Sequence, residues 1–437
     1  MVAMNRLKTI LTNVCRVLLG LTFIFSGYVK AIDPLGTQYK IQDYLKVLDF
    51  YEYVPDWLTL MVSVVLSAVE FSLGIFMLFA IRRRIVSRLM VALMTVMTAV
   101  TVWLYVADPI KDCGCFGDAV TLTNGQTLAK NVVLLFCALV TVAWPMRMGR
   151  LVSRTNQWIV INYTALFIFL TSVVCLYKLP VFDFRPYHVG ADLRKGMEIP
   201  QGAPQPEFVT TFIMEKNGQR REFSLEDYPD STWTFIDSKT VQTKAGYVPP
   251  IHDFSITLNS DDEDITKKVI DDPGYTFLLI SPHLEQADDG NFGIIDQIYE
   301  YAQDYHVPFY CLTASTQSAI NHWIDITGAE YPFCTTDETT LKTIIRSNPG
   351  LVLLRNGVVV NKWSHNELPR PEELNGPLDK IPVGKMPNES VGRKIAMVLS
   401  WFALPLALLV LADRLWAWTR WVKRKEKSNR LFQIFKH

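Results

Sequence analysis

Six long apolar segments interrupt an otherwise mixed chain of 437 residues. They are Leu7–Tyr28, Trp57–Ile81, Leu89–Val106, Leu128–Trp144, Trp158–Tyr177 and Ile395–Leu415. Each approaches the ~20 residues that a helix needs to cross ~30 Å of hydrocarbon. The first segment has no small-residue cleavage site behind it, so we expect it to stay as a membrane anchor. The pattern predicts an α-helical membrane bundle of about six transmembrane helices.

Basic residues gather in three places outside these segments, at 82–88, at 147–154 and in the tail from Arg420. With six crossings all three regions lie on one side, and the positive-inside rule makes that side the cytoplasm. Both termini then face the cytoplasm. Residues 29–56, the loop around Cys113 and the region 180–388 face outward.

The polar region between the fifth and sixth apolar segments alternates predicted strands and helices. Two alternating runs, Phe208–Met214 and Thr232–Ile236, predict a small β-element at 181–247. Further strands are expected at Thr276–Ser281, Phe309–Thr313, Leu351–Leu354 and Val358–Trp363, and helices at Phe292–Tyr305, Gln317–Thr327 and Glu338–Arg346. Asn356-Gly357 reads as a hairpin turn. This order predicts a three-layer α/β domain over 248–388, between a bundle at 1–180 and a last helix and basic tail at 389–437.

Composition removes some classes of function. The 43 basic and 43 acidic residues give a net charge of zero, so nothing favours binding to nucleic acid. Seven cysteines are too few for a disulfide-stapled secreted scaffold. The basic tail suits anionic lipid headgroups, and membrane lipids are the partner it indicates.

The motif with the clearest chemistry is Cys113-Gly114-Cys115, in a short polar loop between two apolar segments. Cysteines at this spacing can bridge only if the backbone bends, and Gly114 makes that bend cheap. A strained, exposed disulfide exchanges readily, so we take Cys113 and Cys115 as candidate catalytic thiols. The alternatives are a structural bridge, inert thiols, or a metal shared with a cysteine-rich partner. We assign no metal ligands in this chain.

Two ionisable residues lie inside predicted crossings, where they are costly and usually pair. Counted from the cytoplasmic ends, Arg16 and Glu70 come to similar depth, and we predict a pair between them. The pair would fix how two helices dock, or serve a proton or quinone role. Cys175, near the outer end of the fifth crossing, is a candidate relay thiol. Cys311 and Cys334 are a candidate disulfide across neighbouring strands.

The first 150 residues resemble the DoxX-like membrane family and, within it, the methylamine utilisation protein MauE. The resemblance rests on Arg16-x-x-x-Gly20, Phe25-Ser26-Gly27-x-x-Lys30, Glu70-x-x-x-Gly74, Cys113-Gly114-Cys115-Phe116-Gly117 and Lys130-Asn131. It implies a bacterial four-helix membrane bundle that helps disulfide formation or maturation of a periplasmic client. The chain departs from quinone-linked thiol oxidases, since no second C-x-x-C pair lies in the bundle.

The region 248–375 resembles the thioredoxin fold in its TlpA-like periplasmic form. Pro349, before the strand Leu351–Leu354, matches the cis-proline of that family. The C-x-x-C motif that should follow the first core strand is absent, and Ser281-Pro282-His283-Leu284-Glu285-Gln286-Ala287-Asp288 stands there instead. Without that thiolate the domain cannot exchange disulfides by the usual route. We expect it to hold a client peptide at Pro349 by backbone pairing.

Together these features predict a bacterial inner-membrane protein that handles thiol–disulfide exchange of a periplasmic protein client. The activity would be that of a thiol–disulfide oxidoreductase working through Cys113 and Cys115. One rival hypothesis is a non-enzymatic membrane assembly or scaffold protein. Another is a membrane protein that binds quinone or another small molecule as cofactor at Arg16 and Glu70.

Overall fold

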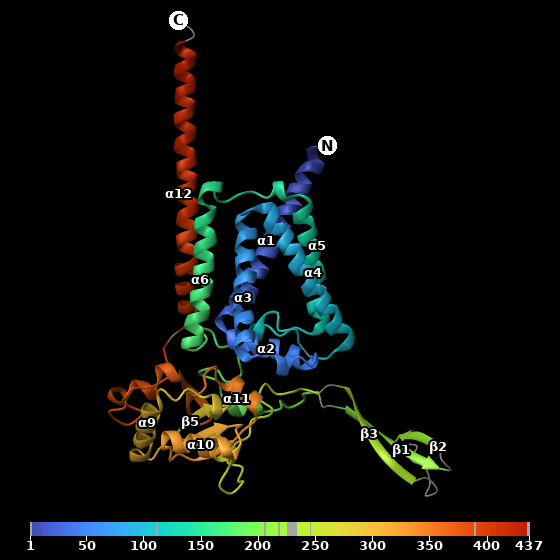
Figure 1. Ribbon diagram of the computed structural model, residues 1–437, viewed down its shortest axis with the longest axis vertical. Helices are drawn as coiled ribbons and strands as arrows, with labels where there is room; N and C mark the ends of the chain where they lie inside the picture. Colours follow the sequence, from blue (N-terminus) through green and yellow to red (C-terminus); the bar gives the residue numbers. More distant parts are fainter. Residues whose placement is uncertain are drawn as a thin grey trace.

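The computed structural model describes residues 2–110, 112–204, 207–216, 219–224, 234–244, 246–388 and 390–434. Side chains are described for all of these except 207–244 and 424–434. The chain divides into a helical bundle, an α/β domain at one end of the bundle, and a small three-stranded sheet that projects from this domain (Figure 1).

Six helices of the described chain are long and apolar enough to cross a membrane. They are α1 (Val2–Ile32), α3 (Asp56–Phe79), α4 (Arg83–Ala107), α5 (Asn124–Ala143), α6 (Gln157–Tyr177) and α12 (Val391–Ile434). The protein is therefore a multi-pass membrane protein, as predicted. The connectors α3–α4 and α5–α6 and both termini lie at the end of the bundle away from the α/β domain (Figure 1). The three basic regions thus share one end.

Helices α1 and α3 pack closely because glycines line their contact. A Cβ atom on Gly27 would lie 2.3 Å from the amide nitrogen of Phe71, and one on Gly74 would lie 2.7 Å from that of Ile24. Any larger side chain at either position would push the helices apart. Glycines quoted for the family resemblance therefore set the distance between two helices.

The peripheral helices α6 and α12 meet α3 through aromatic rings. The Phe402 ring centroid lies 4.4 Å from that of Phe167 and 5.1 Å from that of Phe71. Tyr163 adds a hydroxyl that donates to the Trp401 carbonyl. Most other side chains of α12 are exposed, as expected for a helix that faces lipid along most of its length.

A helix that the hydrophobic pattern did not predict, α2 (Pro34–Val47), follows α1 directly. Proline at its first position and the Asp33 carboxylate, which accepts from the Gly36 amide at 2.9 Å, begin the helix. Its sequence alternates polar and apolar residues without a long apolar run, which is why it was missed. It lies across the end of the bundle, between α3 and the α/β domain (Figure 1).

The α/β domain is built on a six-stranded sheet of order β4-β7-β6-β5-β8-β9. The strands are β4 (Thr257–Leu258), β5 (Tyr275–Ser281), β6 (Phe309–Thr313), β7 (Phe333–Thr335), β8 (Gly350–Arg355) and β9 (Val358–Ser364). The helices are α7 (Leu193–Met197), α8 (Thr266–Ile270), α9 (Phe292–Asp304), α10 (Gln317–Thr327) and α11 (Glu338–Ile344). Helices α9 and α10 cover one face of the sheet, and α8 and α11 the other.

Alternation along the central strands fills both layers of this core. Phe277 and Leu279 face α9 and α10, whereas Leu278 and Ile280 face α8 and α11. Because both faces are buried, the strand reads as a continuous apolar run. The arrangement confirms the predicted fold class, a membrane bundle with a thioredoxin-like domain.

Two predicted backbone features of this domain are confirmed. The Asn348–Pro349 peptide bond is cis. The β8–β9 hairpin turns at Asn356 and Gly357, with φ of 51° and 72°, the positive angles of a type I′ turn.

The small sheet has the order β2-β1-β3, from β1 (Glu207–Lys216), β2 (Gln219–Ser224) and β3 (Thr234–Lys244). The predicted run Phe208–Met214 lies in β1, and the described part of the predicted run Thr232–Ile236 lies in β3. Residues 232 and 233 of the second run fall outside the described residues.

Candidate functional site

The Cys113-Gly114-Cys115 loop joins α4 to α5 at the end of the bundle that meets the thioredoxin-like domain. Gly114 and Gly117 have φ of 64° and 52°, and the Gly117 amide donates to the Gly114 carbonyl at 3.1 Å. This tight turn brings the two sulfur atoms to 3.0 Å, with both cysteines as free thiols. Cys113 and Cys115, which the sequence places one residue apart, therefore face each other as thiols.

Helix α2 covers this loop. The Tyr44 hydroxyl donates to the Cys113 carbonyl at 3.1 Å, and Lys40 pairs with Asp112. The Lys40 side chain also lies against Gly114. Cys113 and Cys115 are only 9% and 7% exposed. The expectation of an exposed pair is wrong, because the sequence did not reveal the helix that shields it.

A buried polar chain connects Cys115 to the interior of the bundle. The Ser26 hydroxyl lies 2.7 Å from the Cys115 carbonyl and 2.8 Å from Glu70 Oε2. Lys30 Nζ donates to the same carboxylate oxygen at 2.7 Å and to Ser26 at 2.9 Å. The ion pair is almost fully buried, with side-chain exposures of 5% and 3%. These contacts tie the thiol loop to α1 and α3.

The predicted pair between Arg16 and Glu70 is wrong. Glu70 pairs with Lys30, one turn beyond Ser26 on α1. Arg16 donates instead to the Gly149 carbonyl in the α5–α6 connector, at the opposite end of the bundle. Helix α1 starts at Val2, so its apolar segment begins outside the bundle. A depth in the membrane counted from Leu7 therefore places Arg16 too far into the bundle. Lys30 was quoted in the family motif, but its partnership with Glu70 was missed.

The surroundings of the two sulfurs separate their acidities. The hydrogen bond from the Cys113 thiol, together with the charges of Lys130 and Lys30, lowers the pKa of Cys115 to about 6 against the opposing effect of burial. The pKa of Cys113 is raised, first because its proton is held by Cys115 and then by burial. The Lys130 amine lies 4.1 Å from the centre of the Phe116 ring, directly after Cys115. The pair therefore loses its first proton easily and its second with difficulty.

We expect alkylation of Cys115 by iodoacetamide to be half-maximal near pH 6 rather than near 9. The thiolate reacts and the thiol does not, so the rate falls as pH drops below this value. Lys130→Gln should move the midpoint upward, because it removes a charge that stabilises the thiolate, and Lys46→Gln should leave it unchanged. Peptide mapping of the alkylated full-length protein in nanodiscs measures it. A midpoint near 9 in the wild type would contradict this electrostatic account.

The remaining cysteines are buried, and one further pair escaped sequence reasoning. Cys15 on α1 and Cys137 on α5 pack in the same core cluster of the bundle. Cys137 lies seven residues from Lys130 along α5, or ~10 Å, so these thiols cannot exchange directly with the loop. Two separate helices supply this pair, and no local motif signals it. Cys175 lies outside the apolar cluster around Cys113 and Cys115, and its relay role stays a prediction.

The predicted Cys311–Cys334 disulfide is wrong. The residues lie on the adjacent parallel strands β6 and β7, with Cys311 opposite Phe333 and Cys334 opposite Leu312. Neighbouring residues of a strand point to opposite faces. Cys311 accordingly packs on the α9–α10 side and Cys334 on the α8–α11 side, both as free thiols.

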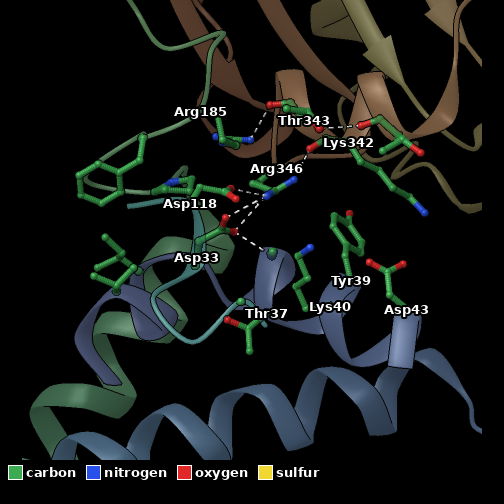
Figure 2. A pocket seen from close by; sticks show the side chains of 18 of the residues that line it. Asp33, Thr37, Tyr39, Lys40, Asp43, Asp118, Arg185, Lys342, Thr343 and Arg346 are labelled. Atoms are coloured by element: carbon green, nitrogen blue, oxygen red, sulfur yellow. Dashed lines mark hydrogen bonds and ion pairs between the residues drawn. The ribbon is translucent and has the colours of Figure 1, made fainter. Parts of the chain in front are cut away.

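Arg346 joins the thioredoxin-like domain to the thiol loop. It follows α11 and extends toward the bundle between two carboxylates, Asp33 and Asp118 (Figure 2). Its Nε and Nη2 donate to Asp33 at 3.0 and 3.0 Å, and Nη2 also lies 3.3 Å from Asp118, three residues after Cys115. Burial alone would raise the pKa of Asp33, but Arg346 lowers it below its ordinary value. One guanidinium thus connects α2, the loop and the domain.

A crevice of about 560 Å³ opens around this contact. Its walls are the backbone of Gly114 and Gly117, the polar face of α2, and α11 with its Lys342 and Arg346 (Figure 2). The volume is typical of clefts that take a ligand. A molecule in this crevice would touch the thiol loop and the thioredoxin-like domain together.

The cis-proline loop, where a client was expected to pair, is internally bonded. The Asn348 carbonyl accepts from the Asp288 amide at 3.0 Å, and the Pro349 carbonyl accepts from the Ser347 hydroxyl at 2.6 Å. Beside it, His283 Nε2 lies 3.0 Å from Glu338 Oε1. These contacts occupy the carbonyls of Asn348 and Pro349. Client binding at Pro349 stays a prediction, and the crevice at Arg346 is a second candidate place for client contact.

Comparison with known proteins assigns part of the chain. Residues 8–144 match the family model of methylamine utilisation protein MauE. These residues form a MauE-like membrane domain. Residues 208–245 match a domain of unknown function (DUF8463). No curated protein matches the chain. A solved structure of a candidate protein disulfide isomerase from Bacteroides thetaiotaomicron shares 16% identity over 26% of this chain and 77% of its own, with a TM-score of 0.23.

Proposed function

We propose that this protein exchanges thiols and disulfides with a client protein through Cys113 and Cys115. The observation that carries the proposal is the pair of sulfurs 3.0 Å apart, one of which has its pKa lowered to about 6. Low-pKa thiols beside cationic groups are typical of reactive cysteines, whereas structural buried cysteines have raised pKa values. Cys311 is such a contrast, because burial raises its pKa.

The lowered pKa of Cys115 favours oxidation of the client over its reduction, and it favours attack of the client on Cys113 rather than on Cys115. Stabilising the Cys115 thiolate stabilises the reduced pair, which makes the disulfide an oxidant. A client thiolate attacks Cys113, the Cys113–Cys115 bond breaks, and Cys115 leaves as the better leaving group. A second client thiolate then attacks the client sulfur of the mixed disulfide and releases Cys113, which takes up a proton. The client becomes oxidised by two electrons and the pair becomes a dithiol.

A client can reach the two thiols only if α2 moves away from the loop, since Tyr44 and Lys40 of α2 shield it. The crevice between α2 and α11 gives the client a place to bind while the loop opens. The thioredoxin-like domain, which lacks its own C-x-x-C, contributes Arg346 and Lys342 to this surface. Its role in this proposal is to position the client and hold the loop.

The positive-inside rule supports an orientation in a bacterial inner membrane with both termini in the cytoplasm. The thiol loop and the thioredoxin-like domain then face the periplasm, where disulfides persist. The DoxX-like and TlpA-like resemblances stay predictions that agree with this location.

Transfer of one disulfide from the oxidised protein to a reduced dithiol peptide tests the proposal. We expect stoichiometric oxidation of the peptide by the wild type and none by Cys113→Ser. An unreacted peptide with intact Cys113–Cys115 disulfide would refute it.

A second candidate function is a non-enzymatic assembly role. The observation in its favour is that both thiols are buried and that Arg346 bonds Asp118 in the loop that carries them. In that case Cys113→Ser and Cys115→Ser would leave function intact. A pair of Arg16 and Glu70 does not carry a small-molecule site, since Arg16 donates to the Gly149 carbonyl whereas Glu70 pairs with Lys30.

A further inference from the structure

Arginine side chains converge on the α5–α6 connector. This connector lies at the end of the bundle away from the α/β domain (Figure 1). Arg83 donates to the carbonyls of Met146 and Met148 at 2.9 and 2.5 Å. Arg16 donates to the carbonyl of Gly149, and Arg414 to that of Arg150 at 2.8 Å. Among the described side chains none of these guanidinium groups pairs with a carboxylate. Among the described side chains Asp413 is the carboxylate beside this connector. It lies within electrostatic range of Arg414 and accepts hydrogen bonds from Ser153 and Asn156, so the arginines still outnumber the negative charges here.

The cluster also holds donors that nothing in the protein satisfies. The Nε atoms of Arg16, Arg83 and Arg150 are buried and have no hydrogen-bond acceptor. The side chain of Arg150 donates to no acceptor at all within the described residues. A buried donor without a partner costs about 1–3 kcal/mol. An anion seated among these groups would satisfy the donors and the charge at once.

Repulsion within the cluster adds to this need. Arg83 lies within electrostatic range of both Arg150 and Arg154. Like charges brought together oppose folding, so an anion bound here would reduce the repulsion.

We propose that this cluster binds the phosphate of an anionic phospholipid. The cluster lies where the apolar helices end, at the level where headgroups sit. Exposed apolar side chains stand beside it, with Ile85 and Met146 each 51% exposed, and these would lie along an acyl chain. Basic clusters between helix ends at this level suit such headgroups. A free phosphate would use the arginines but not this apolar surface.

The test compares phosphatidylglycerol, phosphatidylcholine and inorganic phosphate as additives to the purified full-length protein in detergent. We expect phosphatidylglycerol alone to raise the melting temperature of the wild type. Arg150→Gln should need about fivefold more lipid for the same shift, as expected from ~1 kcal/mol per basic residue. Arg150 is the cleanest position because its side chain makes no hydrogen bond that the fold needs. Arg88→Gln, an exposed arginine further along α4, is the matched control.

With phosphatidylglycerol, the melting temperature of Arg88→Gln should rise as much as that of the wild type. The proposal fails if Arg150→Gln responds to phosphatidylglycerol like the wild type, or if phosphatidylcholine is equally effective. An equal shift with inorganic phosphate would assign the site to a free anion and also overturn it. These outcomes do not depend on the thiol chemistry.

Discussion

Cys115→Ser is expected to abolish disulfide transfer completely and to accumulate a mixed disulfide between Cys113 and a disulfide-containing peptide. Cys113 can still attack the peptide disulfide, but no second sulfur lies 3.0 Å away to release the product. Removing Cys115 also removes the hydrogen bond that raises the pKa of Cys113, so its thiolate becomes easier to form. Intact mass of the full-length variant measures the adduct.

The matched control is Cys113→Ser. It leaves Cys115 in place but removes the hydrogen bond from Cys113 that is the first cause of its lowered pKa, so Cys115 should form little adduct. The wild type should form none that persists, because Cys115 resolves it. Absence of adduct on both variants, with client maturation unimpaired, would favour the assembly role.

Arg346→Met should destabilise the junction between the bundle and the thioredoxin-like domain by about 3–5 kcal/mol, the cost of breaking a buried ion pair. The side chain of Arg346 is 7% exposed and that of Asp33 is 20% exposed, so the carboxylate left behind cannot be fully solvated. Asp118 loses its contact too, and the thiol loop should open. We expect a lower melting temperature and faster alkylation of Cys113.

Two further variants separate charge from packing. Asp33→Asn combined with Arg346→Met removes both charges, so its loss of stability should be smaller than the sum of the single losses. Arg355→Met, at the exposed end of the β8–β9 hairpin, should change neither readout. If protease cleaved the junction between the bundle and the thioredoxin-like domain equally fast in Arg346→Met and in the wild type, the contacts of Arg346 with Asp33 and Asp118 would not hold the two parts together.

The periodic parts of the fold could be predicted from the sequence. Six apolar segments gave six membrane helices because a continuous apolar run of that length has few alternatives. The helix Gln317–Thr327 and the strand Phe309–Thr313 were predicted with their observed bounds, since each has a clear period between turn residues. The hairpin at Asn356-Gly357 followed from the positive φ angles that these residues tolerate.

The site could be predicted only where its chemistry is local. Cys113 and Cys115 lie in one turn, so the sequence alone predicted that they pair. Lys30 and Glu70, Cys15 and Cys137, and Arg346 and Asp33 come from different elements, and only packing decides such partners. Arg16 was misplaced because an apolar run does not mark where the bundle ends. The Cys311–Cys334 disulfide failed because strand adjacency does not ensure a shared face.

The central claim is that the Cys113–Cys115 disulfide passes to a client. In the most direct measurement, oxidised full-length protein is mixed with a reduced dithiol peptide, which serves as the client. All free thiols are then alkylated, and mass spectrometry counts the reagent groups on the client peptide and on the peptide that contains Cys113 and Cys115. We predict two reagent masses on the Cys113–Cys115 peptide and none on the client peptide. Two reagent masses on the client peptide and none on the pair would contradict the account.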